Sequence, residues 1–245
     1  MTFYVKYIYY IYMKTKIKYE REIEQIIDHL LFWVIMLIIA IIEYDDLTFN
    51  GPIMSAFWFA SILMIVSWII SINLPAGARK HRKRWFIPTN STVNNIMLKQ
   101  QTKEQNKNAV KIGIIWIIFL LIEGLSLHFN IITEKFVILG LVILRIADRL
   151  FILIWCPFGA IMNNKCCTSC RIYGWDQLML NSPLVFFPSA YSYGLIALSF
   201  IPFIEWELAV HRHPERFFQA TNCAIRCSNC TSVCGRCKNK HSSMR

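Results

Sequence analysis

Apolar residues in this chain form long continuous runs, and they do not alternate with polar residues at helical or strand spacing. Residues 30–42 are thirteen consecutive apolar residues, and residues 53–74 form a second, longer run. Because a helix needs about 20 apolar residues to cross a bilayer, the first run must extend back to Ile23. The pattern predicts a helical hairpin over 23–74 that lies in a membrane.

Two further runs, 111–129 and 136–155, predict a second hairpin over 111–155. A fifth run covers 183–206, but three prolines interrupt it. Proline removes a backbone donor and clashes with the preceding turn, so this segment is either a kinked span or a re-entrant hairpin. The predicted fold is all-α: an integral membrane bundle of four to five spans. The bundle occupies residues 1–206, and a small cysteine-rich basic tail follows over 207–245.

The loop at 75–110 is basic, with five Lys and Arg between Arg79 and Arg84. Cytoplasmic loops of membrane proteins carry an excess of Lys and Arg, so we expect this loop and the N-terminus to lie inside. The same residues suit anionic lipid head groups. Lys99, Lys103 and Lys107 are four apart and predict a solvated or membrane-surface helix within the loop.

The composition supports a membrane location. Hydrophobic residues make up 56% of the chain and charged residues 17%, against roughly 45–50% and about 25% in soluble domains. We therefore attribute the net charge of +11 to Lys and Arg on cytoplasmic loops and near anionic lipid head groups, and we expect no nucleic-acid partner. The expected location is a prokaryotic cytoplasmic membrane.

The side of the tail is the difficult part of this topology. A spanning fifth helix would put the tail outside, although from Glu207 it carries seven Lys and Arg against two Glu. It would also separate the tail from the cysteine loop at 156–182, which is expected inside. A re-entrant fifth segment removes both conflicts, whereas five full spans is the simpler arrangement and the one we slightly favour.

Four ionisable residues are expected at bilayer depth: Glu123, Arg145, Asp148 and Arg149. Each costs about 2.5–3.5 kcal/mol on insertion scales, so each needs a partner. Asp148 can pair with Arg145 across i, i+3, which leaves Arg149 to pair with Glu123 of the adjacent helix. The favoured interpretation is a structural ion pair, and the alternative is a proton or anion route through a transporter.

The cysteines provide the clearest candidate chemistry. All nine fall in two stretches, four in the loop and five in the tail. Thiolates at short spacing suit zinc or an iron–sulfur cluster. The candidate ligands are Cys156, Cys166, Cys167, Cys170, Cys223, Cys227, Cys230, Cys234 and Cys237.

Three metal sites are compatible with the spacing. One is a four-cysteine zinc site within the tail, from the pairs Cys227/Cys230 and Cys234/Cys237. The second is a shared site in which Cys167/Cys170 join Cys227/Cys230. The third is an iron–sulfur cluster in either stretch. Disulfides or redox-active thiols are the alternative to metal.

Two strings resemble signature stretches of an uncharacterised prokaryotic membrane-protein family. They are NKCCTSCRIYGWD (164–176) and PERFFQATNCAIRCSNC (214–230), within about the C-terminal third of the chain. The resemblance implies a shared architecture and no particular reaction.

The sequence therefore predicts a polytopic membrane protein of unknown activity with cysteine-bound metal, structural zinc, at the membrane surface. The alternatives are an iron–sulfur electron-transfer protein and a transporter that uses the buried charges. Hydrolase triads, phosphate-binding loops and dinucleotide fingerprints are not visible in the sequence.

Overall fold

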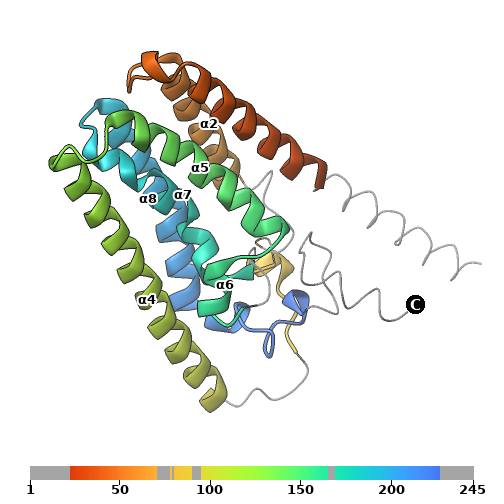
Figure 1. Ribbon diagram of the computed structural model, residues 1–245. Helices are drawn as coiled ribbons and strands as arrows, with labels where there is room; N and C mark the ends of the chain where they lie inside the picture. The colour runs from red at the N-terminus through yellow and green to blue at the C-terminus, as the bar shows by residue number, and fades with distance from the viewer. Residues whose placement is uncertain (1–22, 71–77, 79, 90–94, 165–168, 227–245) are drawn as a thin grey trace, which may run out of the picture.

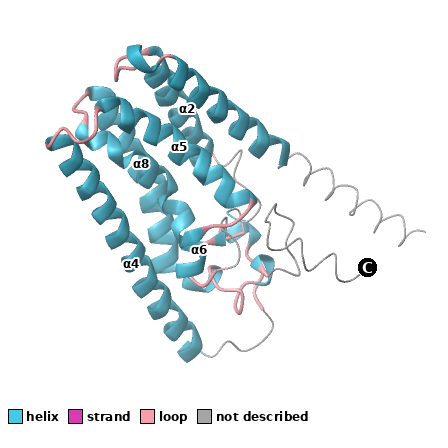
Figure 2. Cartoon of the chain, viewed as in Figure 1, coloured by secondary structure: helices cyan, strands magenta, loops and turns pink. Residues whose placement is uncertain are grey.

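The computed structural model of the protein describes residues 23–70, 78, 80–89, 95–164 and 169–226, and these form a bundle of helices (Figures 1 and 2). The long helices are Ile23–Ile42, α2 (Pro52–Ile69), α4 (Asn95–His128), α5 (Glu134–Leu153) and α8 (Ala190–Arg212). The short helices are η1 (Tyr44–Asp46), η2 (Lys83–Trp85), α6 (Pro157–Ile161), η4 (Arg171–Trp175), α7 (Asp176–Asn181), η5 (Ser182–Phe186), η6 (Pro214–Arg216) and η7 (Cys223–Ile225). The described residues contain no strand, and the one isolated bridge joins Pro88 to Asn222.

In the part of the chain that the structure describes, four helices are long and apolar enough to cross a membrane: Ile23–Ile42, Pro52–Ile69, Ile96–His128 and Ala190–Arg212. α5, with 20 residues, is as long as Ile23–Ile42, but it carries the charges at positions 145, 148 and 149. Many apolar side chains of α4 face outward, and Ile117 and Leu121 are 57% and 60% exposed. For the described residues, the prediction of a helical chain with several helices long and apolar enough to cross a membrane is confirmed.

The bundle has two ends, which we name by their contents. The turn end holds residues 43–51, 129–133 and 187–189. There Lys135 donates to the Asp45 carbonyl at 2.8 Å, and the rings of Phe49 and Phe187 stack at 4.7 Å. The cysteine end holds residues 78, 80–89, 156–164, 169–175 and 207–226.

Residues 171–186 lead from the cysteine end to the turn end through η4, α7 and η5 (Figure 1). Arg171 is ion-paired with Glu207 near the end of α8, whereas Phe187 lies against Phe49 at the opposite end. α8 then runs back from the turn end to the cysteine end. The described fold therefore contains an irregular leg and a separate full helix where the sequence suggested one interrupted segment over 183–206.

The polar stretch before residue 110 also differs from the prediction. The sequence analysis placed 75–110 in a loop with its own surface helix, whereas α4 begins at Asn95 and continues through His128. Residues 95–112 contain neither proline nor glycine and are rich in Lys and Gln, which favour helix. No residue there ends the helix, so the polar segment and the apolar segment form one element.

Candidate functional site

Arg145 lies at the centre of the bundle and is fully buried. Its guanidinium donates to Gln177 Oε1 at 3.0 Å, to Ser61 Oγ at 2.9 Å and to Asn181 Oδ1 at 2.6 Å. The rings of Trp33 and Phe57 face it, with centroids 5.8 and 5.2 Å from Cζ. One side chain of α5 thus binds α2 and α7 through neutral acceptors.

The expected pairing of Arg145 with Asp148 is wrong. Asp148 is ion-paired with its neighbour Arg149, with Nη2 2.7 Å from Oδ2. Arg149 therefore does not need Glu123, whose Oε2 is buried and accepts no hydrogen bond from the described residues. The i, i+3 spacing was compatible with the first pairing, but the Arg145 side chain points to α7 instead.

A second carboxyl group meets Asp148 from α7. Asp176 hydrogen-bonds to Asp148, and its Oδ2 accepts a hydrogen bond from Gln177 Nε2 at 3.1 Å. A hydrogen bond between two carboxyl groups needs one proton, and two adjacent carboxylates cannot both ionise cheaply. Because Asp148 is already paired with Arg149, the proton belongs on Asp176.

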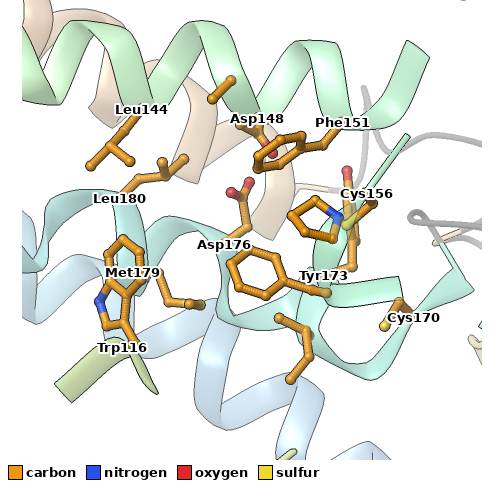
Figure 3. Close-up of a pocket in the computed structure, with 14 residues that line it drawn as sticks. Trp116, Leu144, Asp148, Phe151, Cys156, Cys170, Tyr173, Asp176, Met179 and Leu180 are labelled. Atoms are coloured by element: carbon orange, nitrogen blue, oxygen red, sulfur yellow. The ribbon is translucent and has the colours of Figure 1, made fainter. Parts of the chain in front are cut away.

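This carboxyl pair forms part of the wall of a cavity of about 220 Å³ (Figure 3). Figure 3 shows Asp148 descending from α5 and Asp176 rising from α7 toward it. Most of the wall is apolar, and aromatic rings from α4, α5, α6 and η4 contribute to it. The lining residues are Trp116, Leu144, Ala147, Asp148, Phe151, Cys156, Pro157, Phe158, Cys170, Ile172, Tyr173, Asp176, Met179 and Leu180.

The structure describes three of the nine predicted metal ligands, and they do not lie together. Cys156 and Cys170 line the cavity, and Cys170 packs among Ile112, Met162 and other buried residues. Cys223 lies 3.4 Å from Thr89 Oγ1. Cys166, Cys167, Cys227, Cys230, Cys234 and Cys237 lie outside the described residues. Within the described part of the chain, no three His, Cys, Asp or Glu side chains are grouped closely enough to hold a metal ion.

Residues 213–226, which we call the tail root, dock against the loop at 78–89. His81 is buried, stacks on Phe217 with centroids 4.4 Å apart, and donates from Nδ1 to the Arg216 carbonyl at 3.0 Å. Asn222, also fully buried, donates to the carbonyls of Lys80 and Arg216 at 3.1 and 2.8 Å. The Cys223 amide donates to the Ile87 carbonyl at 2.8 Å.

The cysteine loop is fixed to the same end. Arg171 and Glu207 form a two-point ion pair, with one contact of 2.9 Å from Nε, and Trp175 Nε1 donates to Glu207 at 2.7 Å. Asn164 Nδ2 donates to the Ser169 carbonyl at 3.1 Å, so the two described residues on either side of positions 165–168 are in contact. Both cysteine stretches therefore begin at one end of the bundle.

Sequence reasoning missed the partners of the buried charges. Ser61, Gln177 and Asn181 bind Arg145, and Asp176 completes the carboxyl pair. The sequence did contain a signal for these partners. An Arg at bilayer depth requires hydrogen-bond acceptors, and these polar side chains lie in or beside apolar runs.

Comparison with protein-family models, with curated proteins and with solved structures finds no match for this chain.

Proposed function

We propose that the chain is an integral membrane protein whose cysteine-rich tail binds a structural zinc ion at the cytoplasmic membrane surface. The observation that carries this proposal is the docked tail root. His81, Asn222 and the Cys223 amide hold residues 213–226 against the bundle, so the pairs that follow begin at a fixed place. Four thiolates in two C-x-x-C pairs suit a closed tetrahedral zinc site.

The positions of the described cysteines favour the tail-only site over the shared one. Cys170 is 2% exposed and faces the apolar cavity, and Cys156 faces the same cavity. Cys223 lies apart, beside Thr89. Under this proposal Cys227, Cys230, Cys234 and Cys237 hold the metal, and the loop thiols do not.

The path of the chain supports one topology. The four candidate spans, α5 and the leg at 171–186 make six passes between the ends of the bundle. An even number of passes puts the tail on the side of the N-terminus and of the basic loop, which we propose is the cytoplasm. This removes the conflict with the positive-inside rule, because the basic tail is then inside.

In this proposal the buried charges have a structural role. Every acceptor of Arg145 is a neutral side chain that belongs to another helix. This arrangement joins helices, whereas a conducting route needs charges arranged along a path. Arg145, Asp148 and Arg149 therefore hold α5 in the bundle.

Metal analysis of the detergent-purified full chain tests the zinc site. We expect about one zinc per chain, lost in Cys227→Ser and Cys234→Ser. Cys166→Ser and Cys167→Ser are the matched controls and should keep the metal. Loss of zinc in Cys167→Ser would instead support the shared site, and iron with visible absorbance would support the iron–sulfur alternative.

Thiol labelling of intact cells tests the topology. Ser243→Cys in the tail should react with an impermeant maleimide only after the cells are permeabilised. Thr48→Cys at the exposed turn end should react without permeabilisation. Labelling of Ser243→Cys from outside would disprove the proposed orientation of the tail.

A further inference from the structure

The cavity beside Asp148 and Asp176 is independent of the proposed zinc site and has the properties of a ligand pocket. Its walls come from α5, α6, η4 and α7, which follow one another along the chain, and from Trp116 of the more distant α4. Its volume of about 220 Å³ is below the roughly 300–1,000 Å³ of pockets for drug-sized molecules. A ligand of one ring or two fused rings is the size that this space admits.

The polar groups of the cavity wall are few and they converge. The hydrogen-bonded carboxyl groups of Asp148 and Asp176 lie together in its wall, and Cys156 and Cys170 also line it (Figure 3). Asp176 lies inside the bundle but keeps accessible surface, and its carboxyl group lines the cavity. A mostly apolar pocket with a few convergent polar groups is the usual form of a small-molecule site.

The proton of the carboxyl pair makes Asp176 a hydrogen-bond donor. Asp148 is ion-paired with Arg149, with Nη2 2.7 Å from Oδ2. Gln177 donates to Asp176 Oδ2 at 3.1 Å and is itself fixed by Arg145. The hydrogen bond from Gln177 thus fixes the orientation of the Asp176 carboxyl group. A ligand oxygen that replaces Asp148 as the acceptor could then take the hydrogen bond from the Asp176 O–H.

The charges around the cavity select the class of ligand. Arg145 and Arg149 contribute two positive charges, and the carboxyl pair with its one proton contributes one negative charge. A cationic ligand would add to this excess in an apolar setting, which is costly. An anionic ligand would have to leave water for a wall that is almost entirely apolar and that neither arginine lines, which is costly as well. A neutral molecule with an oxygen acceptor adds no charge and satisfies the Asp176 donor.

We propose that this cavity binds a small, neutral, quinone-like molecule whose ring packs between the aromatic walls and whose carbonyl oxygen accepts a hydrogen bond from Asp176. Trp116, Phe151, Phe158 and Tyr173 supply the aromatic surface. Offset or edge-to-face contacts with such rings favour a planar body. The inference concerns binding alone and requires no reaction.

Two probes of the same shape separate the carbonyl contact from simple apolar filling. Duroquinone has a fully methylated ring, so thiols do not add to it, and durene has the same methylated ring without the oxygens. An occupant of the cavity should slow alkylation of Cys156 by N-ethylmaleimide, measured for each cysteine by peptide mass spectrometry. Cys223, which does not line the cavity, is the internal control.

We expect duroquinone to protect Cys156 of the full chain at about three- to tenfold lower concentration than durene, the value of one neutral hydrogen bond. Asp176→Asn keeps a donor and should keep this preference. In the Asp176→Leu variant the two probes should protect Cys156 equally. Protection by durene would show that the cavity of this variant is intact. Comparing the ratio of the two probes between variants cancels their partition into detergent.

Ala147→Leu places extra volume in the cavity and should abolish protection by both probes. The proposal is overturned if neither probe changes the rate at Cys156, or if Asp176→Leu keeps the preference for duroquinone. It is also overturned if Ala147→Leu is protected as the wild type is. None of these outcomes bears on the zinc content of the tail, so the two proposals can fail separately.

Discussion

Asn181 accepts a hydrogen bond of 2.6 Å from Arg145 and donates one of 2.8 Å to Ser199 of α8. The two residues are separated by 36 positions, and both are fully buried. Through this one contact α5 is joined to α7 and, by the second hydrogen bond, to α8. Ser61 of α2 accepts from the same guanidinium at 2.9 Å, so Arg145 joins α5 directly to α2 and α7 and, through Asn181, to α8.

Removing the Arg145 guanidinium should strongly destabilise the bundle. Arg145→Met leaves the oxygens of Gln177 and Asn181 buried without their donor, and each unsatisfied group costs about 1–3 kcal/mol. We expect the free energy of unfolding to fall by about 3 kcal/mol or more. Reversible unfolding in mixed detergent micelles measures it.

Arg82→Gln is the matched control for that change. Its partner Glu205 is half exposed, and such pairs contribute less than about 1 kcal/mol. A combined change of Arg145, Gln177 and Asn181 to apolar residues should recover part of the loss, because no acceptor is then left unsatisfied. An Arg145→Met variant as stable as the wild type would contradict the network.

Gly174→Ala should be among the most damaging of the glycine substitutions. A Cβ at this position would lie 2.1 Å from Trp206 Cγ, so the backbone of η4 can approach α8 this closely only without a side chain. We expect a loss of about 2 kcal/mol or more in the free energy of unfolding, from strain and overpacking. The same detergent titration measures this loss.

Gly194→Ala provides the comparison within α8. Nothing lies within 4 Å of its Cβ position, and alanine favours a helix over glycine by about 1 kcal/mol. The variant should be as stable as the wild type or more stable. Equal effects of the two substitutions would mean that η4 and α8 are not in contact.

The apolar runs were sufficient to predict the helices, but not the contacts between them. The first hairpin and the helix at 134–153 lie close to their predicted bounds, because mostly apolar stretches of about 20 residues between turn-forming segments favour a helix of that length. The start of α8 was missed, although Pro188 and Ser189 mark it. Ser189 is the N-cap and its oxygen accepts from the Ser192 amide at 3.0 Å.

The partners of Arg145 could not be predicted in the same way. Its acceptors on α7 reach it only because residues 171–186 return through the bundle as an irregular leg. The i, i+3 spacing along α5 predicted Asp148 as the partner of Arg145. Such spacing contains no information about where residues 171–186 pack. The cavity depends on the same leg, so Asp176 was not recognised as a site residue.

The pair between Arg171 and Glu207 should fix the cysteine loop to α8. Glu207 accepts two contacts from Arg171 and one from Trp175, and both ionic side chains are largely covered. Glu207→Gln should weaken the ionic part by about 1–2 kcal/mol, with allowance for partial exposure. Hydrogen exchange should then increase over residues 169–176.

Glu205→Gln, two residues earlier, is the matched control. It removes the exposed partner of Arg82 and should leave hydrogen exchange over 169–176 unchanged. If both variants open the loop equally, the Arg171 pair does not hold it.

Acidification should weaken docking of the tail root through His81. Burial is the main cause that lowers the pKa of His81 from 6.5 to about 4, and the charge of Lys80 adds to it, against the hydrogen bonds that raise it. Between pH 6.5 and 4 the undocked histidine therefore binds a proton, whereas the docked histidine stays neutral. Docking is unaffected above pH 6.5 and loses up to about 3 kcal/mol as the pH falls to 4.

His81→Phe should remove most of this pH dependence while keeping the docked structure. Phenylalanine can stack on Phe217 as the imidazole does, and the Arg216 carbonyl keeps a donor in Asn222 Nδ2 at 2.8 Å. Hydrogen exchange over residues 213–226, compared between wild type and variant at each pH, cancels the intrinsic effect of pH on exchange. His213→Gln controls for the neighbouring pair with Glu215, at 3.2 Å. Parallel pH profiles for wild type and His81→Phe, with a changed profile for His213→Gln, would assign the effect to His213.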